Sequence, residues 1–488
     1  MRFKTWDRVI WSTLLGTLVI SAGAFAQSNA AEQHVAKQHH YKVVDLGTFG
    51  GPFSTVTGFS HALTARGTVV GGADTPDANP NPGCLNTAQG GNDCNVNHAF
   101  LWRHGTLTDL GTLPGGVNSF PQGANSDGWV VGTSENGTTD PVLGIPEFQA
   151  VLWRNGQIQT LGTLGGNESI GFDVNGHGQI VGLAANAVPD PASMFGFATQ
   201  TRPFVWKDGV MRDLDTLGGT DGAAFLMNEH GQVMGQFYVQ GTTTLHTIFW
   251  DEDGNAVDVG TLGGTNSNCS SCGPWWINNR GQVAGNSTLA GDATHHGFVW
   301  DRGTLTDLGT LGGDNSEANS VNDSGVVVGR ADVPGSLTHH GFLFRHGVMT
   351  DLGVIGGDAC STAYSINSAG QIVGDAGICF VGGRAWLWEN GGPMVDLNDL
   401  ALPGSGLHLQ DARLINDRGE IVCTGVLPNG DLHAVLLIPV GEANDSASHA
   451  PAAAQTSVAR SIPSGPQQPS RSPHNDRYRI PGLRLSSR

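Results

Sequence analysis

Cysteine spacing is the first feature of this 488-residue chain that has chemical consequences. Cys84 and Cys94 flank a long polar stretch, and Cys360 and Cys379 fall in two loops of one sequence unit. Both spacings predict a disulfide bond, and disulfides persist in oxidising compartments outside the cytoplasm.

A Cys-x-x-Cys motif adds Cys269 and Cys272 to the disulfide candidates. Such a motif beside a βαβ unit would indicate a redox centre, but no βαβ pattern surrounds this one. We therefore favour a local disulfide and keep a redox site as the alternative.

Aspartate, asparagine and histidine recur in a pattern that could suggest catalysis or metal binding. The phrases Asp-Leu-Gly and Asn-x-x-Gly appear in nearly every unit, at places where these side chains bond the local backbone. A catalytic pair is expected in one or two units only. The pairs His295-His296 and His339-His340 lack a Cys or carboxylate at fixed spacing. We predict structural roles here, with no catalytic residue and no metal site.

Internal repeats define the elements that position these residues. The phrase Asp-Leu-Gly-Thr-Leu and its variants occur eight times, mostly 44 to 53 residues apart. A Phe-Leu-Trp phrase precedes each copy but the first, and a Gln-Val-Val-Gly phrase follows Asn-x-x-Gly. Each unit predicts four short antiparallel strands, A to D, with tight A–B and C–D turns. Four strands about every 45 residues are typical of a propeller blade.

The two ends of the repeat region predict how the ring closes. Tyr41–Gly47 reads as a lone D strand, whereas the last unit has strands A, B and C but no D. Pairing Tyr41–Gly47 with His433–Val440 would complete the last blade. The fold class is therefore all-β: an eight-bladed β-propeller of four-stranded antiparallel blades, closed by an N-terminal strand that pairs with the last blade.

A glycine recurs in the B strand of most units, and we expect large side chains of the next blade to approach it closely. The glycines are Gly182, Gly235, Gly285, Gly329 and Gly374. Cys423 holds this place in the last unit, which predicts a buried, unpaired thiol.

The variable loops indicate where binding should occur. In an antiparallel blade the B–C and D–A loops emerge on the same face, and these are the long loops here. Their polar residues could contact carbohydrate or Ca²⁺, although solvated turns are the simpler interpretation. The binding candidates are Asn167, Glu168, Asp314, Asn315 and Asp358.

The recurring His-Ala-Phe-Leu-Trp and Asp-Leu-Gly-Thr-Leu-Gly-Gly phrases resemble the bacterial extracellular HAF-repeat proteins. The resemblance spans Tyr41 to about Val440, although His-Ala-Phe itself is intact only at His98. It implies an exported protein without an assigned activity, and it carries over no catalytic residues.

Composition and the chain ends complete the domain prediction. Residues 1–26 read as a signal peptide with an Ala-Phe-Ala cleavage pattern, 27–40 as a linker, 41–440 as the propeller and 441–488 as a disordered tail. The net charge of −19 argues against nucleic-acid binding, and no second apolar run predicts a span after signal cleavage. We expect a secreted monomer, extracellular or periplasmic, without a cofactor.

Two functions remain open from the sequence. The first is a non-enzymatic binding or scaffold propeller with a glycan or protein ligand on the face of the B–C and D–A loops. The alternative is a carbohydrate-active or other hydrolytic enzyme with its site at the central channel mouth. Non-repeated carboxylates or histidines that converge in one place would distinguish a single site from eight equivalent ones.

Overall fold

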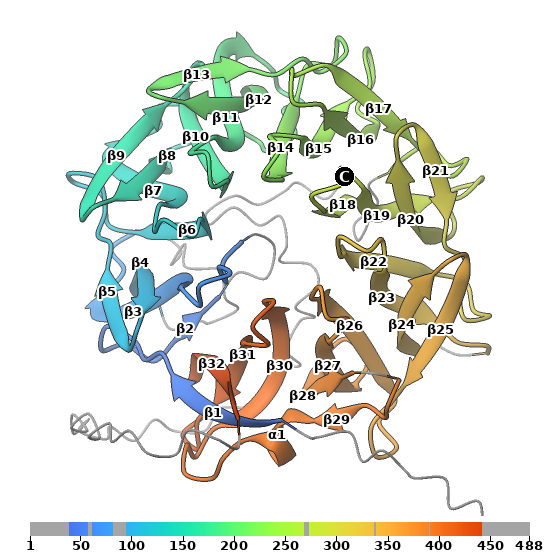
Figure 1. Cartoon of the computed structure of the whole chain (residues 1–488). Helices are drawn as coiled ribbons and strands as arrows, with labels where there is room; N and C mark the ends of the chain where they lie inside the picture. Colours follow the sequence, from blue (N-terminus) through green and yellow to red (C-terminus); the bar gives the residue numbers. More distant parts are fainter. Residues whose placement is uncertain are drawn as a thin grey trace, which may run out of the picture. The chain divides into compact units, whose positions relative to one another are not determined.

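The repeats fold, in a computed structural model, into eight four-stranded antiparallel sheets arranged as the blades of a β-propeller (Figure 1). The structure describes residues 39–56, 61–81, 94–267, 273–335, 338–389 and 391–441. Within these ranges the chain forms 32 strands and one short helix, α1 (Leu397–Leu400). The predicted fold class is confirmed.

The first four blades follow the chain, each from its innermost to its outermost strand. Blade 1 contains β2 (Ser54–Thr55), β3 (Val69–Ala78), β4 (Asn95–Arg103) and β5 (Thr106–Asp109). Blade 2 contains β6 (Ser119–Ala124), β7 (Val130–Thr139), β8 (Pro146–Arg154) and β9 (Gln157–Gly162). Blade 3 contains β10 (Gly165–Val174), β11 (Ile180–Pro189), β12 (Thr199–Lys207) and β13 (Val210–Asp213). Blade 4 contains β14 (Gly222–Met227), β15 (Val233–Tyr238), β16 (Leu245–Trp250) and β17 (Ala256–Gly260).

The remaining blades continue this order, and the last one borrows a strand from the start of the chain. Blade 5 contains β18 (Gly273–Ile277), β19 (Val283–Thr288), β20 (His295–Asp301) and β21 (Thr304–Asp307). Blade 6 contains β22 (Ser316–Val321), β23 (Val327–Asp332), β24 (His339–Arg345) and β25 (Val348–Gly353). Blade 7 contains β26 (Cys360–Ile366), β27 (Ile372–Ile378), β28 (Gly382–Trp388) and β29 (Val395–Asp396). Blade 8 contains β30 (His408–Ile415), β31 (Ile421–Val426), β32 (Leu432–Val440) and β1 (His40–Asp45).

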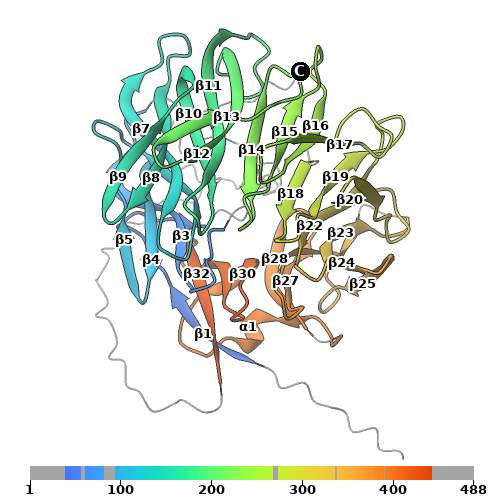
Figure 2. The same ribbon diagram turned by 45° about the horizontal axis from the view of Figure 1, so that its top comes forward.

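The ring closes through β1, as predicted. β1 pairs antiparallel with β32 along its whole length, from His40 opposite Val440 to Asp45 opposite Val435. The Tyr41 side chain is fully buried, in the same cluster as Leu397 and Leu400 of α1. Figure 2 shows β1 beside β32, with α1 next to them. Two segments from opposite ends of the chain therefore share one hydrophobic core.

The asparagine of each Asn-x-x-Gly phrase joins one blade to the next. Its Oδ1 accepts local N–H groups, as those of His177 and Gln179 do at Asn175, which confirms the predicted turn role. Its Nδ2 also donates to a backbone carbonyl of the following blade, over 2.8 to 3.4 Å. These links run from Asn125 to Asn175, Asn175 to Asn228, Asn228 to Asn278, Asn278 to Asn322, Asn322 to Asn367, Asn367 to Asn416 and Asn416 to Thr64. The last link joins blade 8 to Thr64 of blade 1, across the closure of the ring.

The repeated aspartate also has a structural role, and it pairs with a polar residue of the C strand of its blade. Asp109, for example, accepts from the Gly111 N–H at 2.7 Å and lies 2.9 Å from His98 Nδ1. All eight blades have such a pair within the described residues: His98–Asp109, Gln149–Thr160, Arg202–Asp213, His246–Asp258, His296–Asp307, His340–Asp351, Arg384–Asp396 and His433–Asp45. Recurrence around the ring fits a structural function for these histidines and aspartates.

The glycine of the B strand meets a different neighbour from the one predicted. A Cβ on Gly182 would lie 2.0 Å from the Ile170 carbonyl oxygen and 2.7 Å from the Phe204 ring. Both neighbours belong to the same blade, so the expectation that the next blade presses there is wrong. The cause is a register shift in β10 directly after Gly171, the partner of Gly182, which disturbs the ladder beside the glycine.

Cys423 replaces this glycine in β31, and it is buried and unpaired, as predicted. Burial raises the pKa of its thiol. β30 carries an additional register shift between Leu409 and Asp411, at a place where β10 is regular. Blade 8 thus has both the extra register shift and, in Cys423, a side chain larger than the glycine of the other blades.

Candidate functional site

The five binding candidates lie in two separate groups. Asn167 and Glu168 begin β10 of blade 3, whereas Asp314, Asn315 and Asp358 lie in the D–A loops that enter blades 6 and 7. The structure therefore brings the second group into neighbouring blades and leaves the first group in another part of the ring.

Most of these candidates bond to loops of their own or the preceding blade. Asn315 donates from Nδ2 to Asp332 at 3.0 Å and accepts the His295 N–H at 3.1 Å. Asp358 forms an ion pair with Arg384 at 3.1 Å, and Asp314 is exposed. These contacts fix the D–A loops, and whether the same residues also bind a ligand stays a prediction.

Glu168 is almost completely buried beside a second carboxyl group. It is 1% exposed, and Asn167 donates to the neighbouring Asp140 at 2.8 Å. Burial raises the pKa of Glu168 to about 8, and the Asp140 carboxylate adds to the increase. Glu168 is therefore largely protonated at neutral pH. Burial acts to raise the Asp140 pKa, but hydrogen bonds from Asn167 and the Leu143 backbone outweigh it and hold the pKa low, and protonated Glu168 adds to their effect.

This pair makes stability depend on pH. Because the folded pKa of Glu168 lies above its unfolded value, the native state binds the extra proton, and stability falls as the pH rises from about 4.5 through about 8. Glu168→Gln keeps a donor without a titrating group. We expect it to raise the unfolding free energy at pH 9 by roughly 2 kcal/mol and to change it little at pH 5. Urea unfolding at both pH values measures this, and an equal change at the two would contradict the assignment.

Charged residues that do not repeat gather in blades 6, 7 and 8. When the eight repeats are aligned, the position directly after the B-strand glycine forms one column. Most blades carry a small or uncharged residue in this column, but blades 6 and 7 carry Arg330 and Asp375. Their register partners in the innermost strands are Glu317 and Thr362. Arg330 binds Glu317 with two hydrogen bonds of 3.0 and 2.5 Å, inside the protein.

β-Bulges re-aim a second set of non-repeated side chains in the same blades. Among the described residues, seven innermost strands shift register at the same place, and the residue there is Tyr364 in blade 7 and Arg413 in blade 8. The Arg413 guanidinium lies 4.7 Å from the Tyr364 ring centre and 2.8 Å from Asp411. Charged and aromatic side chains therefore join blades 7 and 8. At the same positions the other blades carry different side chains.

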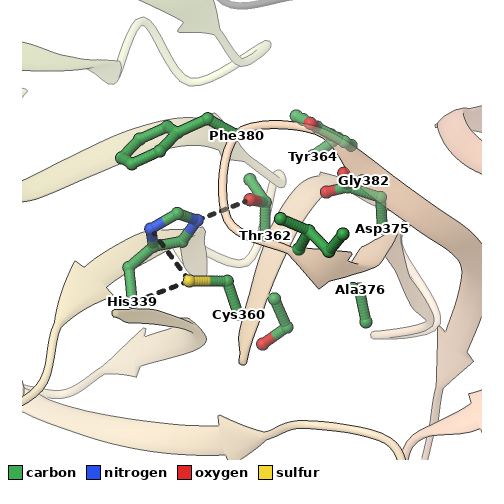
Figure 3. Close-up of a pocket in the computed structure, with 11 residues that line it drawn as sticks. His339, Cys360, Thr362, Tyr364, Asp375, Ala376, Phe380 and Gly382 are labelled. Carbon is green, nitrogen blue, oxygen red and sulfur yellow. Dashed lines mark hydrogen bonds between the residues drawn. The ribbon is translucent and has the colours of Figure 1, made fainter. Parts of the chain in front are cut away.

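A pocket opens between blades 6 and 7 next to this cluster (Figure 3). Its volume is about 270 Å³, including space that is open to solvent. β24 contributes one residue, and β26, β27 and the β27–β28 hairpin contribute the others. The lining residues are His339, Cys360, Ser361, Thr362, Tyr364, Asp375, Ala376, Gly377, Ile378, Phe380 and Gly382.

His339 forms one wall of the pocket. Its Nδ1 lies 3.5 Å from Cys360 Sγ, its Nε2 lies 3.5 Å from Thr362 Oγ1, and its ring centre is 4.9 Å from that of Phe380. Burial and then the positive charge of Arg330 lower the pKa of His339 to about 3. The imidazole is therefore uncharged throughout the physiological range.

Asp375 supplies an acceptor at the opposite wall. Burial raises its pKa to about 6, and Asp411 adds to the increase, while Arg413 and the Tyr364 hydroxyl act against it. Within the described part of the chain no group hydrogen-bonds its Oδ1. A Cβ on Gly382, where φ is +75°, would lie 2.8 Å from its Oδ2, so the glycine leaves room for the carboxyl group.

The β27–β28 hairpin covers the pocket with an exposed apolar tip. Ile378, Phe380 and Val381 are 70%, 42% and 38% exposed. The Cys360–Cys379 disulfide ties this hairpin to β26, with 5.0 Å between the two Cα atoms. This disulfide confirms one of the sequence predictions and holds the apolar tip in place.

The other cysteine predictions have mixed outcomes. Cys94 is disulfide-bonded, but its predicted partner Cys84 lies outside the described residues. Cys269 and Cys272 also lie outside them, so the local disulfide stays a prediction.

Sequence reasoning missed most of this pocket. In the sequence His339 stands out only as the neighbour of His340, and nothing local marks Asp375 or Phe380. Their partners come from another blade or from a hairpin, so no short motif joins them. The available signal was the repeat itself, because Arg330 and Asp375 depart from their columns in adjacent units.

A second non-repeated cluster crosses the propeller axis. His61 Nδ1 of blade 1 lies 2.9 Å from Asp173 of blade 3, and the His61 ring packs edge-on against Trp276 of blade 5 at 5.6 Å. Blades 1 and 5 are opposite each other in a ring of eight. Burial lowers the His61 pKa, but the charge and hydrogen bond of Asp173 outweigh it and raise the pKa overall.

No helix among the described residues is long and apolar enough to cross a membrane.

Comparison with known proteins gives similarity in structure only. No family model matches the sequence, and no curated protein matches it. A solved structure titled putative TolB from Agrobacterium tumefaciens is 13% identical, with a TM-score of 0.30, over 50% of this chain and 85% of its own. Oligogalacturonate lyase in complex with manganese is 12% identical, with a TM-score of 0.41, over 82% and 96%.

A third solved structure, dipeptidyl peptidase 4 from Porphyromonas gingivalis, is 9% identical with a TM-score of 0.40. The match covers 68% of this chain and about half, 54%, of the peptidase. None of these similarities indicates an activity or a substrate, so the function is argued from the site itself.

Proposed function

We propose that this protein is an exported binding propeller that holds one sugar residue of a glycan in the pocket between blades 6 and 7. The observation that carries the proposal is that the half-exposed ring of Phe380, beside His339, lines the same pocket as the Asp375 carboxyl group and the Thr362 hydroxyl.

This combination matches the chemistry of a sugar ring. A pyranose has an apolar C–H face, which packs on the negative face of an aromatic ring. Its hydroxyl groups donate to a carboxylate, and charge assistance makes such hydrogen bonds stronger than neutral ones. Asp375 lines the pocket, and within the described residues no group hydrogen-bonds its buried Oδ1.

The rigidity of the pocket supports the same function. The disulfide fixes the hairpin before binding, which lowers the entropic cost of association. The disulfide also fits a chain exported to an oxidising compartment.

Pairing of the buried charges favours binding over catalysis. Glu317 is neutralised by Arg330, and Asp411 by Arg413. The repeated aspartates and histidines are engaged in the structural pairs around the ring. Asp375 is the acidic residue that lines the pocket, and among the described residues it forms no ion pair.

Glycan-array binding by residues 27–488 tests this function. We expect Phe380→Ala to weaken binding to a positive glycan at least tenfold, or about 1.4 kcal/mol, since the stacking surface is lost. Val142→Ala is the matched control, because Val142 is an exposed apolar residue in another B–C loop. Absence of glycan binding, or equal loss in both variants, would contradict the proposal.

The pH dependence gives a separate check on Asp375. Because its carboxylate is the acceptor, binding should strengthen as the pH rises through about 6, and Asp375→Asn should remove this dependence.

The His61–Asp173 pair favours a second candidate function, a hydrolytic enzyme with its site at the axis. Asp173 is fully buried and fixes the imidazole through Nδ1, while the His61 side chain is 39% exposed, so its Nε2 could act on a water molecule. Turnover of chromogenic esters or glycosides that is lost in His61→Ala would support this function over simple binding.

A further inference from the structure

A soft-metal ligand set lies at the base of the β27–β28 hairpin. One ligand atom each of His339, Cys360 and Cys379 lies within 4.8 Å of the other two. The set combines blade 6 with blade 7, and its members are 19 to 40 residues apart in sequence. In the oxidised protein the two sulfur atoms are bonded to each other.

We propose that reduction of the Cys360–Cys379 disulfide turns this corner of the pocket into a Zn²⁺ site formed by His339, Cys360 and Cys379. The proposal does not depend on sugar binding, since it concerns the protein and the metal alone.

The geometry needs little change to accept the metal. Tetrahedral Zn²⁺ with Zn–S near 2.3 Å and Zn–N near 2.0 Å places two sulfur ligands about 3.8 Å apart and a sulfur and a nitrogen about 3.5 Å apart. His339 Nδ1 already lies 3.5 Å from Cys360 Sγ. Cys379 Sγ must move away from Cys360 Sγ and settle near His339, from which it lies within 4.8 Å, and reduction removes the bond that prevents this movement.

The surroundings supply the supporting contacts that zinc sites use. His339 Nε2 faces Thr362 Oγ1 at 3.5 Å, which would orient the ring from its other nitrogen. The backbone N–H of His339 points at Cys360 Sγ at 3.3 Å, and such a donor stabilises a thiolate. His339 and Cys360 line the pocket, so a water molecule can complete the coordination from that side.

The reduction is an ordinary exchange with a dithiol. One thiolate of the dithiol attacks Cys379 Sγ, which is less buried than Cys360 Sγ, and forms a mixed disulfide while Cys360 leaves as a thiolate. The second thiol of the dithiol loses its proton to water and attacks the dithiol sulfur of the mixed disulfide, so that the dithiol leaves as a cyclic disulfide and Cys379 as a thiolate. The dithiol loses two electrons and the protein gains them. Zn²⁺ then binds the two thiolates in place of the protons that they would otherwise take up.

The consequence is a second means of holding the hairpin. The disulfide keeps Ile378, Phe380 and Val381 in place in an oxidising compartment, and the metal would keep them there when the disulfide is reduced.

Metal titration of the reduced, full-length protein tests the proposal. The protein is reduced with a phosphine, desalted without oxygen and titrated with Co²⁺, whose thiolate charge-transfer absorption reports sulfur ligation, and with Zn²⁺ against a chromophoric chelator. We expect one equivalent more Zn²⁺ in the reduced wild type than in C360S/C379S, and at least tenfold weaker binding at that site in His339→Ala. The oxidised protein should lack this equivalent.

His340→Ala is the matched control, because His340 adjoins His339 but pairs with Asp351. Cys423→Ser controls for the buried free thiol. If C360S/C379S does not fold, His339→Ala still decides the question, since it leaves both cysteines in place. Equal stoichiometry and affinity in the wild type and His339→Ala, or the same charge-transfer band without Cys360 and Cys379, would overturn the proposal.

Discussion

A chain that begins at Thr48, and therefore lacks β1, is expected to lose its cooperative thermal unfolding transition. Without β1, the fully buried Tyr41 is missing from the core that it shares with Leu397 and Leu400. β32 also becomes an unpaired edge with apolar residues on it. Loss of one buried aromatic side chain alone costs about 3–5 kcal/mol, a large part of the net stability of a typical domain.

The control for this truncation keeps β1 and removes only the residues before it, starting at Gln38. That chain should melt like the longer one. A synthetic peptide of residues 38–48, added to the truncated chain, should restore part of the transition because it can pair with β32. A truncated chain with an unchanged melting temperature by circular dichroism would show that β1 does not close the ring.

Asn322→Asp is expected to destabilise the protein by about 2–4 kcal/mol, a loss that combines a missing buried hydrogen bond with an unpaired buried charge. The wild-type Oδ1 accepts the N–H groups of Ser324 and Val326, and an aspartate can still accept both. The Nδ2 donor to the Asn367 carbonyl, at 3.0 Å, is lost, and an anionic oxygen then faces that carbonyl. The substitution therefore removes the hydrogen bond between blades 6 and 7 and leaves the hydrogen bonds of the local turn in place.

Asn155→Asp is the matched control, because Asn155 occupies an exposed turn with φ +53° that aspartate also tolerates. Its free energy of unfolding, measured by urea denaturation, should stay within about 0.5 kcal/mol of the wild-type value. If Asn322→Asp and Asn155→Asp shift the midpoint equally, the asparagine links between blades do not stabilise the ring.

The repeats made the architecture predictable from the sequence. Strand period, turn glycines and the spare D strand at Tyr41–Gly47 are local patterns, and together they predicted eight blades and the closure with His433–Val440. The repeats also predicted the structural role of the recurring Asp and Asn. A residue that recurs in nearly every blade is expected to stabilise the blade itself, and these side chains do accept local backbone N–H groups.

Contacts between strands were harder to predict. The environment of Gly182 depends on a register shift in β10, which no residue type signals, so the sequence suggested the wrong neighbour. The asparagine links to the next blade depend on how closely adjacent blades pack, which the sequence does not specify either.

The candidate site was the least predictable part. His339 lies far in sequence from Asp375 and Phe380, and they meet because the C strand of one blade adjoins the A and B strands of the next. The predicted Cys360–Cys379 disulfide is the one part of the candidate site that the sequence indicated, because it fixes the β27–β28 hairpin that covers the pocket. Comparison of the repeat columns would have pointed to Arg330 and Asp375, because charge there is confined to blades 6 and 7.

Hydrogen–deuterium exchange with and without a glycan bound tests most directly whether ligand binding is confined to one site. The account predicts slower exchange in peptides from β24 (His339–Arg345) and from Cys360 to Gly382, with little change elsewhere in the ring. Protection spread evenly over the D–A loops of all eight blades, or confined to peptides around His61 and Asp173, would contradict it.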